Sequence, residues 1–262
     1  MTVRSRSVTA VAVLTVVLGA AGCGAEADPQ TAGAQTTSSA TTPPKAPKQV
    51  AHLSTASFLP ALKGSMGAKK SVRMTMRMEA AGKVGTITAI QTLNKKPVAM
   101  AMDLSGELFG GKGRMLLVNS KIYVSMKGLA PTGKYIKVDP KDSSDPRAAQ
   151  FSEMLESADP AKTFDAFDAA LQQVKYVRTE TIDGQRLERY AVALDAAAAL
   201  RAQGQKMPAG MPKKLDYTIW LDTKHLMRRL TFDLPGVTTV ITMSDWGKPV
   251  AIKAPSADDI VG

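Results

Sequence analysis

The sequence predicts an α+β protein in which one large antiparallel sheet of about eleven strands carries two to four helices on one face. Residues 71–79, SVRMTMRME, alternate polar and apolar side chains without a break, which is the period of a half-buried strand. Similar segments follow at hairpin spacing up to residue 139. Between residues 146 and 174 the apolar residues change to helical spacing, and strand-like segments return from residue 175.

The expected strands form two groups, one on each side of the helical stretch. The connections within each group are short, and Asn119-Ser120 and Asp183-Gly184 suit tight hairpin turns. Because strands joined by tight turns pair antiparallel, each group is predicted to form a meander. The strands are expected at residues 71–79, 85–93, 97–105, 114–118, 121–126 and 134–139, and at 175–182, 185–194, 216–222, 226–234 and 237–246.

Two amphipathic helices are expected in the middle of the chain and a shorter one near its end. The first covers residues 146–158, and the second follows Asp159 and Pro160, an N-cap and a first-turn proline. The apolar stripe of the second helix consists of Phe164, Phe167, Leu171 and Val174. The third helix is capped by Asp195 and ends at Gly204. Since an apolar stripe must be buried, we expect these helices to pack on the apolar face of the sheet.

Residues 1–22 are predicted to be an export signal that is absent from the mature protein. Two arginines precede an apolar run of 14 residues at 8–21, which is shorter than the ~20 residues that a membrane-spanning helix needs. The segment LGAAGC that ends at Cys23 resembles a bacterial lipobox, whose cysteine becomes the lipidated first residue. Ala20 stands where leucine is common. An ordinary signal peptide with a chance cysteine is the alternative.

Cys23 is the only cysteine of the chain, so an internal disulfide is excluded. Residues 23–50 are predicted to be the lipidated cysteine and a disordered tether, because they hold almost no large apolar residue. Such a tether reaches about 25–30 Å. Residues 51–262 have the length of a single ordinary domain. Lipidation of Cys23 predicts that this domain is anchored at the extracytoplasmic face of the cell membrane.

The charge of the chain favours some partners over others. Removal of the signal with its two arginines leaves 32 basic and 23 acidic side chains, a net charge of +9. Nucleic acid is a poor partner for a protein outside the cell. Anionic lipid headgroups and polyanionic wall polymers attract scattered Lys and Arg. Solubility alone explains the excess equally well, because no dense basic run is present.

No pattern in the sequence predicts an enzyme. The two histidines, His52 and His225, have no second His or Cys at metal-ligand spacing. Nucleophile elbows, phosphate-binding glycine loops and Ser/Lys acylation motifs are all missing. Asp165 and Asp168 lie one turn apart, but beside Phe164 and Phe167 they are more simply the solvated side of a helix. We therefore expect no catalytic residue, no metal site and no cofactor.

The apolar face of the first and third strands is unusually rich in methionine. Methionine repacks easily and is over-used at surfaces that accept variable apolar partners. One interpretation is a lipid-sized cavity with an adjustable wall; the other is a loosely built core. For the first interpretation the cavity lining is predicted to be Val72, Met74, Met76, Met78, Val98, Met100, Met102, Leu104, Phe164 and Phe167. Met207 and Met211, in the loop at 205–214, are candidates for a lid.

This order of elements resembles the actinobacterial lipoproteins of the LppX, LprA, LprF and LprG group, which share the LolA-like fold. The resemblance covers residues 51–262 and is most evident in SFLPALKGSMGAKKSVRMTMRME, DYTIWLDTKHLMRRLTFDLPG and SDWGKPVAIKAP. It implies a half-barrel, a strongly curved antiparallel sheet with helices across its concave side. Members of the group hold acyl chains of lipids or glycolipids there and help to move them outward from the membrane. No specific binding residue is carried over.

Three functions are therefore expected from the sequence. The first is a membrane-anchored carrier of lipid or glycolipid across the cell envelope. The second is a cell-envelope sensor or scaffold that binds a protein partner. The third is a chaperone for other lipoproteins, whose cargo is a protein-linked acyl chain. Each of these functions is compatible with an envelope transporter or another envelope protein as a partner.

Overall fold

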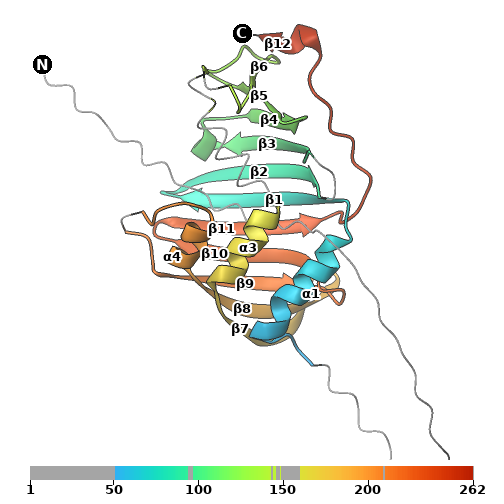
Figure 1. Ribbon diagram of the computed structural model, residues 1–262, viewed down its shortest axis with the longest axis vertical. Helices are drawn as coiled ribbons and strands as arrows, with labels where there is room; N and C mark the ends of the chain where they lie inside the picture. The colour runs from blue at the N-terminus through green and yellow to red at the C-terminus, as the bar shows by residue number, and fades with distance from the viewer. Residues whose placement is uncertain are drawn as a thin grey trace, which may run out of the picture.

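The structure is a computed structural model that describes residues 51–261 apart from 94–96, 143, 146–147, 149–159 and 209. Its main feature is one strongly curved, unclosed sheet of twelve strands in the order β12-β6-β5-β4-β3-β2-β1-β11-β10-β9-β8-β7 (Figure 1). All neighbouring strands pair antiparallel except β12 and β6, which are parallel. β1 and β11 meet in the middle, so the two predicted meanders join into a single sheet.

The eleven expected strands are confirmed, most of them within two residues of their predicted ends. The third begins at Met100 instead of residue 97, so Val98 precedes it. The strands are β1 Ser71–Ala80, β2 Lys83–Thr92, β3 Met100–Gly106, β4 Gly113–Val118, β5 Lys121–Met126, β6 Tyr135–Val138, β7 Leu171–Ile182, β8 Gln185–Asp195, β9 Lys214–Leu221, β10 Met227–Leu234, β11 Val237–Ser244 and β12 Ile260–Val261.

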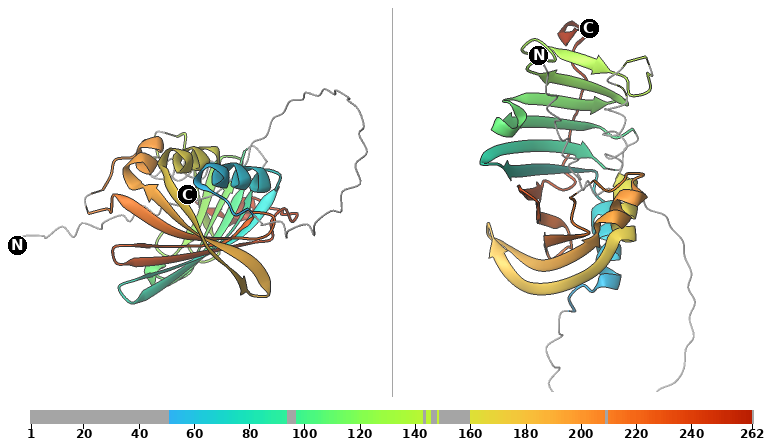
Figure 2. Two further views of the ribbon diagram at one scale, coloured as in Figure 1. Left: turned by 90° about the horizontal axis from the view of Figure 1, so that it is seen from below. Right: turned by 90° about the vertical axis from the view of Figure 1, so that its left-hand side faces the viewer.

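Three α-helices lie on one side of the sheet: α1 Thr55–Gly67, α3 Pro160–Ala170 and α4 Ala196–Ala202. The described residues also form two 3-10 turns, η1 Glu107–Phe109 and η2 Ala257–Asp259. The sheet curves around the helices, which lie on its concave side as expected (Figure 2). The helix expected at residues 146–158 lies outside the described residues, apart from Ala148.

The helix α1 was not among the helices expected from the sequence, and it contains Pro60. Its start is fixed by Ser54, whose side chain accepts from the backbone N–H of Ser57 in a capping box. Phe58, Leu62 and Met66, which recur every four residues, are fully buried. Burial of this stripe outweighs the hydrogen bond that a proline inside a helix removes.

The prediction that Leu171 and Val174 continue the second helix is wrong. The helix α3 ends at Ala170, and both residues belong to β7. Leu171 pairs with Leu194 and Val174 with Val192 in the β8 ladder. The ladder to β8 pairs the backbone groups on one side of this edge segment, which is rich in β-branched residues, so strand pairing overrides the helical spacing.

Candidate functional site

The inner face of the sheet is defined here as the face that carries α1, α3 and α4. Residues directly opposite in a ladder point to the same side, so the register shows which side chains share this face. Met74 of β1 lies opposite Ala89 of β2, which lies opposite Met102 of β3. Met102 in turn lies opposite Met115 of β4. The alternation in the sequence therefore placed these methionines correctly on one face.

Seven of the ten predicted lining residues are buried. Val72, Met74, Met76 and Met78 pack in one apolar cluster with Phe164 and Phe167 of α3, as expected for a helix lying on the sheet. Met100 belongs to a second cluster on the same face, with residues of β4, β5 and β6. Met102 is half-buried and contacts both clusters. Val98 and Leu104 are half-buried and belong to neither cluster.

Much of the first cluster comes from positions that the sequence did not single out. These residues lie on α1 and on the strands β8 to β10, and the largest fully buried ones are Phe58, Leu62, Met66, Tyr190, Leu194, Tyr217, Ile219, Leu221, Met227 and Leu230. The four-residue spacing of Phe58, Leu62 and Met66 behind the capping serine is the signal that could have revealed the helical part of this set.

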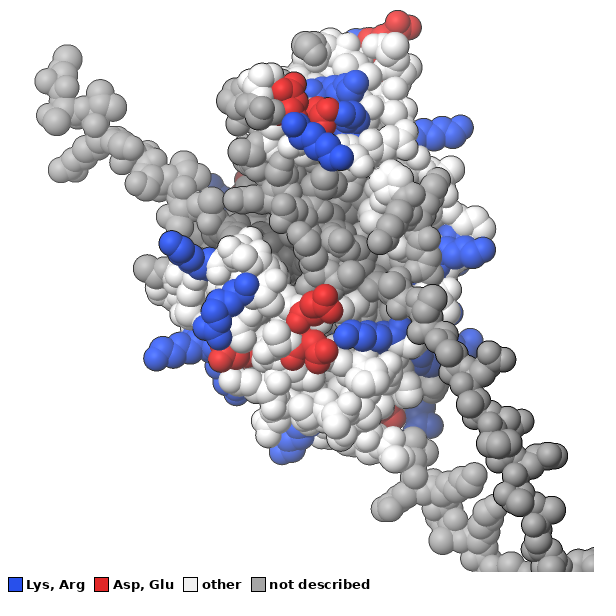
Figure 3. Space-filling view, in the orientation of Figure 1, with Lys and Arg blue, Asp and Glu red and all other residues white. Residues whose placement is uncertain are grey.

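The three helices of the described residues lie over one part of the inner face. Figure 1 shows α1, α3 and α4 over β1 and the strands β7 to β11, with the second cluster further along the sheet on β3 to β6. The same side seen as a surface carries scattered Lys and Arg among uncharged residues, with the acidic side chains interspersed (Figure 3). The described apolar side chains of the inner face form two buried clusters, the first packed against the helices and the second on β3 to β6.

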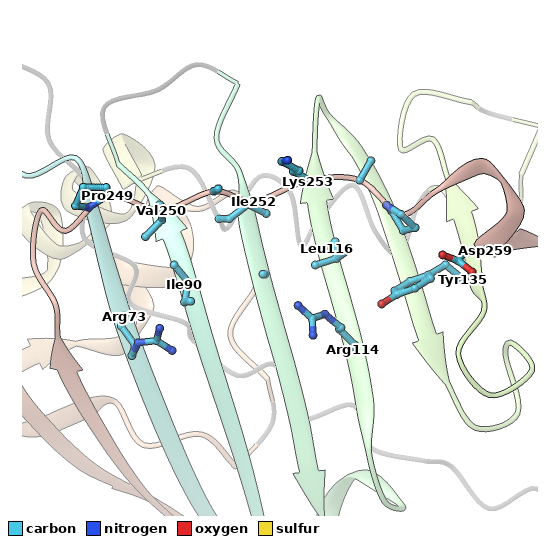
Figure 4. Close-up of a pocket in the computed structure, with 14 residues that line it drawn as sticks. Arg73, Ile90, Arg114, Leu116, Tyr135, Pro249, Val250, Ile252, Lys253 and Asp259 are labelled. Carbon is cyan, nitrogen blue, oxygen red and sulfur yellow. The ribbon is translucent and has the colours of Figure 1, made fainter.

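A cavity of about 510 Å³ lies on the opposite, outer face of the sheet. It forms because residues 249–255, termed the strap, cross this face in an extended conformation before β12 pairs with β6. Ile90, Ala101 and Leu116 form an apolar row in register beneath the strap. Figure 4 shows Arg73 and Arg114 near this row, with Tyr135 further along.

Both arginines of the outer cavity are already paired with acidic groups. Arg73 donates from Nε to Asp245 at 3.1 Å, and Arg114 lies 3.5 Å from a carboxylate oxygen of Asp103. Hydrogen bonds to the Asp245 carboxylate lower its pKa below the ordinary value; the larger effect comes from Lys248 and the smaller from Arg73. Both arginines are therefore held by carboxylates, and the cavity faces away from the methionines of the inner face.

No group of three or more His, Cys, Asp or Glu in the described ranges is placed to hold a metal ion. His52 lies 3.2 Å from Glu188 and stacks on the ring of Tyr176. None of the helices in the described part of the chain is long and apolar enough to cross a membrane.

Comparison with known proteins shows which proteins this chain resembles in sequence and in fold. No protein-family model matches the sequence. The chain is 28% identical over 210 residues to the lipoarabinomannan carrier protein LprG of Mycobacteroides abscessus, an alignment that covers 70% of this chain and 84% of that protein. It also superposes on LprF of Mycobacterium bovis with a TM-score of 0.55, at 16% identity, over 78% of this chain and 97% of LprF. The chain has the fold of LprF and is similar in sequence to LprG.

The LppX/LprG-type architecture extends over nearly all of the described residues. LppX of Mycobacterium tuberculosis superposes with a TM-score of 0.51, at 14% identity, over 76% of this chain and 98% of LppX. At such low identity the fold is shared while individual side chains are not. The family resemblance inferred from the sequence is thus confirmed, and the residues that form the site must be argued from this chain alone.

Proposed function

We propose that this protein is a membrane-anchored lipoprotein that binds the acyl chains of a lipid or glycolipid on the inner face of its sheet and carries them across the cell envelope. The observation that carries the proposal is the row Met74–Ala89–Met102–Met115, four apolar side chains in register that link the two clusters of the inner face. The three methionines in this row are side chains that adapt their shape to an apolar partner.

The energetics of acyl-chain binding fit such a surface. Each buried methylene is worth about 0.8 kcal/mol. A long acyl chain buried along the row therefore offsets the cost of immobilising the ligand without any covalent chemistry. Charged groups would weaken this interaction, and the described side chains of both inner-face clusters are hydrophobic. The relative from M. abscessus is named as a carrier of lipoarabinomannan, which favours a glycolipid cargo.

The anchoring part of the proposal rests on the N-terminal sequence. Cys23 and the tether up to residue 50 lie outside the described residues. Lipidation of Cys23 would hold the domain at the extracytoplasmic face of the cell membrane, within reach of membrane lipids. In this scheme the protein is not an enzyme, since it needs to release its ligand unchanged. A transporter or another envelope protein would supply or receive the cargo.

The proposal is tested by mass spectrometry of organic extracts from the purified Cys23→Ser chain, which lacks the anchor's own acyl groups. We expect lipid with long acyl chains in stoichiometric amount, retained through gel filtration in the absence of detergent. A folded but lipid-free protein, purified from cells that contain the lipids and unable to take them up from vesicles, would contradict the carrier function. That result would favour the alternative, an envelope sensor or scaffold that binds a protein partner.

A further inference from the structure

The hydroxyl of Tyr217 is a buried polar group that the fold leaves unpaired. Tyr217 lies on β9 with only 2% of its surface exposed. Its hydroxyl has no hydrogen-bond partner in the described part of the chain. An unpaired hydroxyl in an apolar interior costs free energy that a phenylalanine at the same place would not. A buried hydroxyl of this kind has a free donor that a bound molecule could pair.

The neighbouring strand shows how this fold treats a buried tyrosine that has a structural role. Tyr190 of β8 is fully buried on the same face. Its hydroxyl donates to the carboxylate of Glu188 and accepts from the backbone N–H of Leu53 at 3.2 Å. The hydroxyl of Tyr190 is therefore satisfied from within the chain, whereas that of Tyr217 is not.

The position of Tyr217 places its hydroxyl on the proposed acyl-binding face. Tyr217 lies opposite Phe232 of β10, and Phe232 lies opposite Thr239 of β11. Thr239 in turn lies opposite Met78 of β1, which is one of the predicted lining residues. The ring centroids of Tyr217 and Phe232 are 5.1 Å apart. An acyl lipid that lies along this row would meet a single aromatic O–H among mostly apolar side chains.

The chemistry of the hydroxyl defines the group that it would recognise. Burial raises the pKa of Tyr217 well above its ordinary value, so the phenol stays neutral and can donate a hydrogen bond. A hydrocarbon tail offers no acceptor, and no cation stands in this row to neutralise a free carboxylate. The ester carbonyl of an acyl lipid is an uncharged acceptor without a donor of its own, and it complements the phenol.

We propose that the Tyr217 hydroxyl donates a hydrogen bond to an ester carbonyl of the bound lipid and so selects acyl esters over ether lipids with the same chains. This inference rests on the proposed function and adds the chemical class of the ligand to it. Tyr217 is then a specificity-determining residue, while the methionines of the inner face supply affinity for the chains.

The test compares two lipids that differ only in the carbonyl groups, 1,2-dipalmitoylglycerol and 1,2-dihexadecylglycerol. The full chain with Cys23→Ser is titrated with each lipid, and binding is followed by displacement of a fluorescent fatty probe. We expect the chain to prefer the ester by about fivefold, in keeping with one buried hydrogen bond. Tyr217→Phe should lose this preference while its affinity for the ether lipid stays unchanged, and it should unfold at the same or a higher denaturant concentration.

Tyr123→Phe is the matched control, because Tyr123 lies on β5 and packs in the outer-face cluster under the C-terminal segment. This variant should retain the preference for the ester. The inference would be overturned if the chain with Tyr217 bound both lipids equally, or if Tyr217→Phe kept the preference for the ester. Either result would leave the carrier function intact. Failure to bind either lipid would instead count against the proposed function itself, and a loss of both affinities in Tyr217→Phe would show a merely structural role.

Discussion

Replacing Met102 with tryptophan should lower the amount of acyl lipid bound by about tenfold, with only a modest loss of stability. Met102 is half-buried, faces Ala89 and Met115 across its two ladders, and contacts both inner-face clusters. An indole there occupies space that hydrocarbon would use. Losing contact with two methylenes costs about 1.6 kcal/mol, which is roughly a tenfold loss of affinity. Met76 is a poorer target, because it is 2% exposed and a larger side chain would strain the core.

The matched control is the adjacent residue on the same strand. Ala101 points to the outer face, where it forms part of the floor of the 510 Å³ cavity beneath the strap. Ala101→Trp should fill that cavity and leave lipid binding unchanged. Bound lipid is measured by mass spectrometry per mole of folded protein, with the folded fraction taken from circular dichroism. The opposite outcome, lipid lost from Ala101→Trp and retained by Met102→Trp, would place the lipid site on the outer face.

Replacing Phe58 with alanine should lower the free energy of unfolding by about 3–5 kcal/mol, the usual cost of deleting a buried aromatic ring. Phe58 is 0% exposed and holds α1 against the sheet. Its ring meets that of Tyr190 edge to face, with centroids 5.6 Å apart. The loss is measured by urea unfolding monitored by circular dichroism.

A conservative truncation at the surface provides the comparison for Phe58. Leu129 is 49% exposed, so Leu129→Ala should change the free energy of unfolding by no more than about 0.5 kcal/mol. If Phe58→Ala also cost less than about 1 kcal/mol, α1 would not be docked on the sheet in solution, and the inner face would lack one of its covering helices.

The strands could be predicted from the sequence because apolar side chains recur at every second residue in several of them, most regularly in β1, and because short turn segments separate them. In Ser71–Ala80 this period separates the methionines from the arginines, and the sheet preserves the separation in every ladder of the inner face. The wrong assignment of Leu171 and Val174 arose because their spacing from Phe164 also fits a helix, and only pairing with β8 distinguishes the two.

Other parts of the fold depend on contacts that a single sequence does not reveal. The strand β12 is two residues long and pairs in parallel with β6, more than a hundred residues earlier. The cavity under the strap depends on this pairing, so it could not be predicted either. Among the site residues, the methionine face follows from periodicity. The unpaired hydroxyl of Tyr217 does not, because the lack of a partner is a property of the folded chain.

The location of the bound acyl chain is the most direct test of the whole account. A palmitoyl lipid with a photoactivatable diazirine in its chain would be bound to the Cys23→Ser protein, cross-linked by light and mapped by tandem mass spectrometry. The account predicts labels on inner-face side chains such as Met74, Met76 and Met102. Labels confined to the strap at residues 249–255, or folded protein that takes up no label, would contradict it.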